Sequence, residues 1–98
     1  MKTKKNNQEK PKWFTGVWYY EGDTVRNPFT GDSCELTGPE LSMYDFIKGA
    51  EYTLAVNQQN SGDFYIEDPS MVKLQKEMIK GLDWFRSQNS SAYMTLLD

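Results

Sequence analysis

The sequence contains no histidine and a single cysteine, Cys34. Histidine is the commonest general base near neutral pH and the commonest metal ligand, so its absence removes the usual routes to acid–base catalysis and metal binding. A lone cysteine cannot form a disulfide within the chain, and without a histidine its thiol has no activating base. We therefore interpret Cys34 as a small core residue on a predicted strand.

Several other signatures are missing. No run of 18 apolar residues occurs, and the N-terminus has no apolar signal core. The chain has no P-loop, dinucleotide-binding glycine pattern or calcium-loop spacing. Asp63, Glu67 and Asp68 are neighbouring carboxylates, but Asp68 is explained as a helix cap and the others as solvated side chains. The sequence predicts a soluble, intracellular protein that is not an enzyme and uses no cofactor or metal.

The composition is that of one small folded domain. The chain has 98 residues, of which 38% are hydrophobic, 26% charged and 14% aromatic, and large rings let a small core bury more area. Its formal net charge of −3 hides an asymmetry, because residues 1–12 carry five lysines against one glutamate. We predict a disordered basic tail over residues 1–12 and a single α+β domain over residues 13–98.

The clearest turn lies at residues 27–32, where Pro28 presets φ and Gly31 tolerates a positive φ. The flanking segments 24–27 and 33–36 alternate in polarity, which predicts an antiparallel hairpin. Residues 17–20 are also β-prone, and we expect them to add a third strand and form a meander. The five aromatic residues between 13 and 20 are typical of core, although stacking on bases or sugars is an alternative.

Two long helices and a short one follow. Thr37 and Glu40 form a capping box at the start of the first helix, whose apolar face carries Met43, Phe46, Ile47, Ala50 and Leu54. Asp68 as N-cap and Pro69 at the first position predict the start of the second helix. Ser90 is expected to cap a last short helix over residues 91–97. We predict that the two main helices are antiparallel and pack on the strands.

Some apolar side chains fall outside these core faces. Leu41 and Tyr52 lie on a second stripe of the first helix, which either contacts the preceding hairpin or forms a subunit contact. Trp84 falls on the polar side of the second helix, and the C-terminal segment either folds over it or docks on a neighbouring subunit. The candidate partner contacts are therefore Leu41, Tyr52, Trp84, Tyr93, Met94 and Leu97. Because both helices have wide apolar faces, we expect a homo-oligomer, most simply a two-fold dimer.

Nucleic-acid binding is the alternative. Lys73, Lys76 and Lys80 recur at helical spacing on the second helix, and Lys4 and Lys5 lie in the basic tail. Together they predict weak, non-specific phosphate contacts. The competing interpretation is a solvated face of mixed charge, and the negative net charge argues against strong binding.

Two stretches carry a resemblance to known sequences. Asn27–Glu51 holds an Asn-Pro turn, an acidic helix start and the pattern Tyr-Asp-x-Ile-x-Gly, and Gly81–Asp98 ends in Ala-Tyr-Met-x-Leu-Leu-Asp. These stretches resemble short uncharacterised proteins encoded by tailed phages of marine bacteria. The resemblance implies a phage-type accessory or interaction protein of unknown role, working in the host cytoplasm, and it assigns no functional residue.

Overall fold

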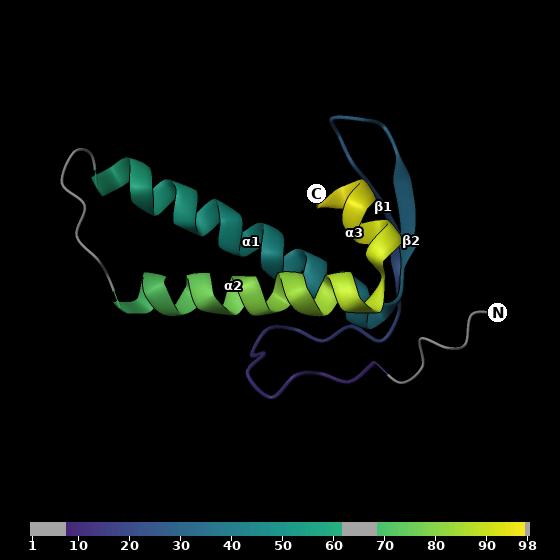
Figure 1. The fold of residues 1–98 in the computed structure, drawn as a ribbon, viewed down its shortest axis with the longest axis horizontal. Coiled ribbons are helices and arrows are strands. Elements are labelled where there is room, and N and C mark those ends of the chain that lie inside the picture. Colours follow the sequence, from purple (N-terminus) through teal and green to yellow (C-terminus); the bar gives the residue numbers. More distant parts are fainter. Residues whose placement is uncertain (1–7, 62–68, 98) are drawn as a thin grey trace.

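The computed structural model describes residues 8–61 and 69–97. Along the chain it forms β1 (Asp23–Arg26), β2 (Ser33–Leu36), α1 (Gly38–Ser61), α2 (Pro69–Gln88) and α3 (Ser90–Leu96). The two long helices run antiparallel, and the hairpin and α3 gather at the end where α1 begins and α2 finishes (Figure 1). The predicted α+β class is confirmed: an antiparallel hairpin, two main antiparallel helices and a short C-terminal helix.

The hairpin follows its sequence pattern closely. β1 and β2 pair antiparallel in a register that places Val25 opposite Cys34. Val25, Cys34 and Leu36 pack against the core, as the alternation predicted, and Leu36 is buried. Gly31 in the turn adopts a φ of 84°, the left-handed region that a residue without a Cβ enters at little cost.

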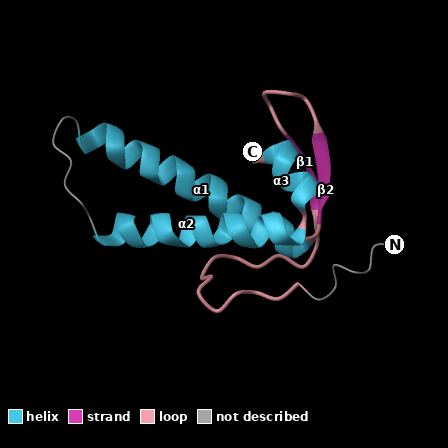
Figure 2. Ribbon diagram, in the orientation of Figure 1, coloured by secondary structure: helices cyan, strands magenta, loops and turns pink. Residues whose placement is uncertain are grey.

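Residues 17–20 form no strand, so the predicted meander is corrected to a two-stranded sheet within residues 8–61 and 69–97. The backbone N–H of Tyr19 donates to Ser42 Oγ at 2.7 Å and not to a neighbouring strand. The segment follows the helix surface because its rings bury area there, which outweighs local β propensity. We call residues 8–20 the N-terminal strap; it is an irregular loop that passes beside α2 (Figure 2).

The prediction that the strap rings belong to the core is borne out in part: Trp13, Phe14 and Trp18 pack in or against the core, whereas Tyr20 is 97% exposed. Phe14 is buried, and its ring packs edge-to-face on Trp18 and Phe46. Trp18 in turn packs against Trp84 of α2, with ring centroids 5.9 Å apart. The ring partner of Trp84 therefore comes from the strap, whereas the C-terminal segment packs on β2 and α2.

The hydrophobic core lies where the strap, the hairpin and the three helices meet. Helical spacing correctly predicted the buried face of α1, since Met43, Ile47 and Ala50 are all buried. Gly81 lets α2 approach α1 closely, because a Cβ at this position would lie 3.1 Å from Met43 Sδ. The core cluster consists of Phe14, Leu36, Met43, Ile47, Phe85, Ala92 and Leu96.

Glu40 sits in the middle of this junction and is 1% exposed. One carboxylate oxygen, Oε1, accepts from the backbone N–H of Thr37 and from Asn89 Nδ2, each at 3.1 Å. The other, Oε2, accepts from Gln8 Nε2 at 2.8 Å. The Thr37 hydroxyl donates to Gln8 Oε1 and accepts from the Glu40 N–H, so the predicted capping box is confirmed. One buried side chain thus joins the strap, the start of α1 and the end of α2.

The other helix starts are partly as predicted. α2 begins at Pro69, while Asp68 lies outside the described residues. α3 is capped by Asn89 and not by Ser90, because Asn89 Oδ1 accepts from the N–H of Ala92. The helix therefore begins at Ser90, one residue earlier than expected, and ends at Leu96.

The strap begins within the segment that the sequence predicts to be a disordered tail. Gln8 belongs to that predicted tail but is buried within the Glu40 network. Residues 1–7 lie outside the described residues.

Further along the strap, the Tyr19 hydroxyl donates to Asp45 Oδ2 at 2.9 Å. This hydrogen bond, together with the repulsion between the carboxylate and a phenolate, raises the pKa of Tyr19 above its usual value.

The close approach of the strap to α1 predicts opposite outcomes for two glycines of that helix. A Cβ on Gly38 would lie 2.5 Å from the Tyr19 carbonyl oxygen, whereas a Cβ on Gly49 meets nothing within 4 Å. We expect Gly38→Ala to lower the free energy of unfolding by about 1–3 kcal/mol through overpacking. Gly49→Ala should raise it by about 0.5–1 kcal/mol through helix propensity.

Urea unfolding followed by tryptophan fluorescence measures both effects. If Gly38→Ala is as stable as the wild type, the strap does not lie against the start of α1.

Candidate interaction cleft

A cleft of about 290 Å³ opens between the hairpin turn, α1 and the C-terminal end of the chain. Its walls come from three segments that are far apart in the sequence. The residues that line it are Asn27, Pro28, Phe29, Tyr44, Lys48, Glu51, Leu96 and Leu97. We call this site the interaction cleft.

Hydrogen bonds centred on Asn27 hold in place the turn that forms one wall. The N–H of Asn27 donates to the Asp32 carbonyl at 2.7 Å, and the N–H of Gly31 donates to the Asn27 carbonyl at 2.8 Å. Asn27 Oδ1 accepts from the N–H of Phe29 at 2.8 Å, an Asx-type turn. Asn27 Nδ2 donates to the Thr95 carbonyl at 2.8 Å. The last bond ties the turn to α3 and so fixes the width of the cleft.

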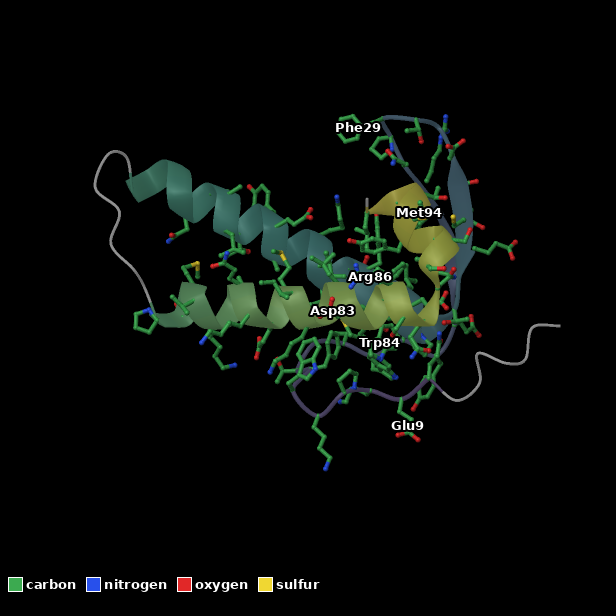
Figure 3. The ribbon with its side chains drawn as sticks, viewed as in Figure 1. Glu9, Phe29, Asp83, Trp84, Arg86 and Met94 are labelled. Atoms are coloured by element: carbon green, nitrogen blue, oxygen red, sulfur yellow. The ribbon has the colours of Figure 1, made fainter. Side chains whose placement is uncertain are left out.

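Phe29 is the most notable side chain of the site because its ring is 92% exposed. It projects from the tip of the hairpin on the side toward α1, and Met94 lies below it on α3 (Figure 3). Met94 is 66% exposed and Tyr52 72% exposed. Tyr52 follows Lys48 by four residues, so the two share one face of α1. An exposed ring on a well-ordered turn, with further exposed apolar side chains nearby, is typical of a protein-binding surface.

The rim carries one charge of each sign. Lys48 Nζ lies 3.3 Å from Glu51 Oε1, and both side chains are about half exposed, at 48% and 45%. An ion pair this open to solvent contributes at most about 1 kcal/mol to stability. Both groups are therefore available to charges on a docked surface.

The structure places the six predicted contact residues in two groups. Leu97 lines the cleft and also packs against the core, and Tyr52 and Met94 are exposed on the helices that border the cleft. Leu41, Trp84 and Tyr93 pack against the core, and the Arg86 guanidinium stacks over the Tyr93 ring at 5.7 Å. On the second apolar stripe of α1, Leu41 thus contacts the core, whereas the Tyr52 side chain is exposed.

Of the eight residues that line the cleft, the sequence predicted only Leu97 as a partner contact. The seven that it missed are Asn27, Pro28, Phe29, Tyr44, Lys48, Glu51 and Leu96. Phe29 did carry a signal, because a large ring directly after Pro28 in a turn has no strand face on which to be buried. Lys48 and Glu51 carried none, since a charged pair at this spacing is ordinary on any exposed helix.

The lysine ridge of the alternative hypothesis lies on α2. Lys73, Lys76 and Lys80 line a hollow of about 530 Å³, together with Pro69, Val72 and Glu77. Lys73 Nζ is bound to Glu77 Oε2 at 2.7 Å, which neutralises part of the ridge. Lys4 and Lys5 lie outside the described residues. This hollow is larger than the interaction cleft, but its described lining comes from a single helix.

Within residues 8–61 and 69–97, no three or more His, Cys, Asp or Glu residues are grouped so that they could hold a metal ion. Cys34 is half-buried in the hairpin. None of the helices in these ranges is both long enough and apolar enough to cross a membrane.

Comparison with known proteins returned no matching protein-family model, no matching curated protein and no matching solved structure. The geometry of the site therefore carries the functional argument.

The role of Asn27 in positioning the turn is testable. Asn27→Ala removes both side-chain hydrogen bonds, so the free energy of unfolding should fall by about 1–2 kcal/mol. Hydrogen exchange at the Phe29 and Gly31 amides should also become faster.

Asn27→Asp is the matched control. It keeps the acceptor for the Phe29 N–H but places a carboxylate oxygen against the Thr95 carbonyl. It should therefore lower the free energy of unfolding at least as much as Asn27→Ala, while exchange at the Phe29 amide stays slower than in Asn27→Ala. An Asn27→Ala variant with unchanged stability and exchange would show that the turn is held by other contacts.

Proposed function

We propose that this chain is a non-catalytic interaction protein that binds a protein surface through the interaction cleft. A phage-type accessory role, as implied by the resemblance of Asn27–Glu51 and Gly81–Asp98, belongs to the same proposal. The observation that carries it is the combination of an exposed ring at Phe29 with a cleft formed by three segments. Interfaces obtain most of their energy from a few buried rings, and this surface presents both a ring and a recess.

The chemistry of the cleft supports a protein ligand. Leu96, Leu97 and Tyr44 give it apolar walls, and Asn27 and Lys48 bring polar groups to its edge. Apolar walls with a few polar groups suit an aliphatic or aromatic side chain with its backbone at the rim. Its volume is at the lower end of the range for small-molecule pockets, about 300–1,000 Å³, and fits one or two side chains.

Weak binding of nucleic acid is the second candidate, favoured by the hollow that Lys73, Lys76 and Lys80 line. It ranks lower because Glu77 already pairs with Lys73 and because the chain carries a net charge of −3. Phosphate contacts by these lysines would be non-specific and strongly dependent on salt.

Two NMR titrations of the isotope-labelled protein separate the candidates. The first probe is N-acetyl-phenylalanine methylamide, which presents one aromatic side chain on a peptide backbone. We expect it to shift the amide signals of Tyr44, Lys48 and Leu97 with a dissociation constant of about 1 mM, or about −4 kcal/mol. N-acetyl-glycine methylamide is the matched control and should leave these signals unchanged.

The second probe is a short DNA duplex at low and at physiological salt. We expect no shift of the Lys73, Lys76 and Lys80 amides at physiological salt. If the duplex shifts these amides while the aromatic probe leaves the cleft unchanged, the nucleic-acid function replaces the proposed one.

A further inference from the structure

We infer that the interaction cleft is filled by Phe29 of a second copy of this chain, in a two-fold dimer in which each Phe29 inserts into the other protomer's cleft. This inference rests on the proposed function, because it names the protein surface that the cleft binds.

Phe29, the anchor of the inferred dimer, is already held in position before the two copies associate. Phe29 sits on a turn fixed by backbone hydrogen bonds at Asn27 and Gly31 and by the bond from Asn27 Nδ2 to Thr95. Its ring is 92% exposed, so it contributes little to folding and has nearly its whole surface available for burial. An ordered anchor loses little backbone entropy on binding, and this favours affinity.

The volume of the interaction cleft is large enough for the Phe29 ring. A cavity of about 150 Å³ lined by apolar side chains holds one benzene molecule. The cleft measures about 290 Å³, which admits a phenyl ring together with part of the turn that carries it. Leu96 and Leu97 supply aliphatic contacts for the ring, and Tyr44 offers an aromatic one.

The arrangement of anchor and receptor favours a second copy over a foreign protein. Phe29 lines the cleft itself, so ring and recess share one face of the molecule. A two-fold contact requires a surface that is complementary to itself, which means that both parts must lie side by side on each protomer. If the two-fold axis passes between Phe29 and the recess, the rotation places the Phe29 ring of each protomer in the recess of the other.

The charges at the rim are also complementary to those of a second copy of the same surface. Lys48 and Glu51 lie one turn apart on α1, and each is about half exposed. Across a two-fold axis, Lys48 of one protomer meets Glu51 of its partner, and the reverse pair forms by symmetry. A surface with one cation and one anion matches its own copy and gives no net attraction to a strongly charged partner.

The dimer contact has a typical area to meet. A standard interface buries about 800 Å² on each partner, roughly a tenth of the 6959 Å² accessible surface of this chain. Tyr52, which is 72% exposed and shares a face of α1 with Lys48, adds a further exposed ring beside the cleft.

The experiment is sedimentation equilibrium over a range of concentrations for the wild type and two variants. Phe29→Ser should weaken dimerisation about thirtyfold or more, the effect expected for loss of a central aromatic side chain. Tyr20→Ser is the matched control, because Tyr20 is an aromatic residue that is 97% exposed and does not line the cleft. Its dissociation constant should equal that of the wild type, and circular dichroism should show all three proteins folded.

A charge-reversal pair tests the reciprocal ion pairs. Lys48→Glu and Glu51→Lys should each weaken the homodimer, because like charges then face each other across the axis. Mixing the two variants in equal amounts should restore association, since both interfacial pairs become attractive in the mixed dimer.

The inference is overturned if the wild type remains monomeric, or if Phe29→Ser dimerises as well as the wild type. Either result leaves the proposed function standing as long as the aromatic NMR probe still enters the cleft. Because a dimer would fill its own cleft, the probe is titrated into monomeric protein, either the wild type if it is monomeric or Phe29→Ser. Failure of the probe to bind there would instead overturn the proposed function.

Discussion

The whole fold depends on one buried carboxylate. Glu40 is 1% exposed, and an unpaired carboxylate at this depth would cost several kcal/mol. It is tolerated because donors from three segments surround it: Gln8, the Thr37 backbone and Asn89. Each of these donors would in turn be left unsatisfied without Glu40. Glu40 and its donors therefore satisfy one another's hydrogen bonds. These bonds hold together the strap, the start of α1 and the junction of α2 with α3 in an orientation that apolar packing alone would not specify.

The same network positions the interaction cleft. Asn89 donates to Glu40 and, through its Oδ1, caps α3 at Ala92, so the orientation of α3 is set from the Glu40 side. α3 then carries Leu96 to the cleft wall, and the Thr95 carbonyl receives the bond from Asn27 that fixes the turn. A chain of directional hydrogen bonds thus runs from the core junction to the exposed ring of Phe29. Placing the proposed binding surface on this hydrogen-bonded framework would reduce the entropy lost on docking of a partner.

The sequence was sufficient for features that depend on neighbouring residues. The capping box at Thr37 and Glu40, the turn at Gly31 and the helix start at Pro69 each follow from local backbone chemistry, and all three are present. The sequence did not predict the features that depend on contacts between residues far apart in the chain. Residues 17–20 have strand propensity, but Tyr19 instead bonds to Ser42 and the strap rings pack on helices. Asn89 took the capping role expected of Ser90, because its side chain bonds both to Glu40 and to Ala92. The cleft could not be foreseen, since its walls come from three separate segments.

The most direct test of this account is the free energy of unfolding of Glu40→Ala beside that of Glu35→Ala. Glu35 is an exposed residue of β2 and serves as the matched control. If Glu40 joins the three segments, its removal leaves three donors unpaired and lowers the free energy of unfolding by about 3 kcal/mol or more. Glu35→Ala should change it by less than about 0.5 kcal/mol. Equal, small effects of the two substitutions would contradict the central role of the buried carboxylate.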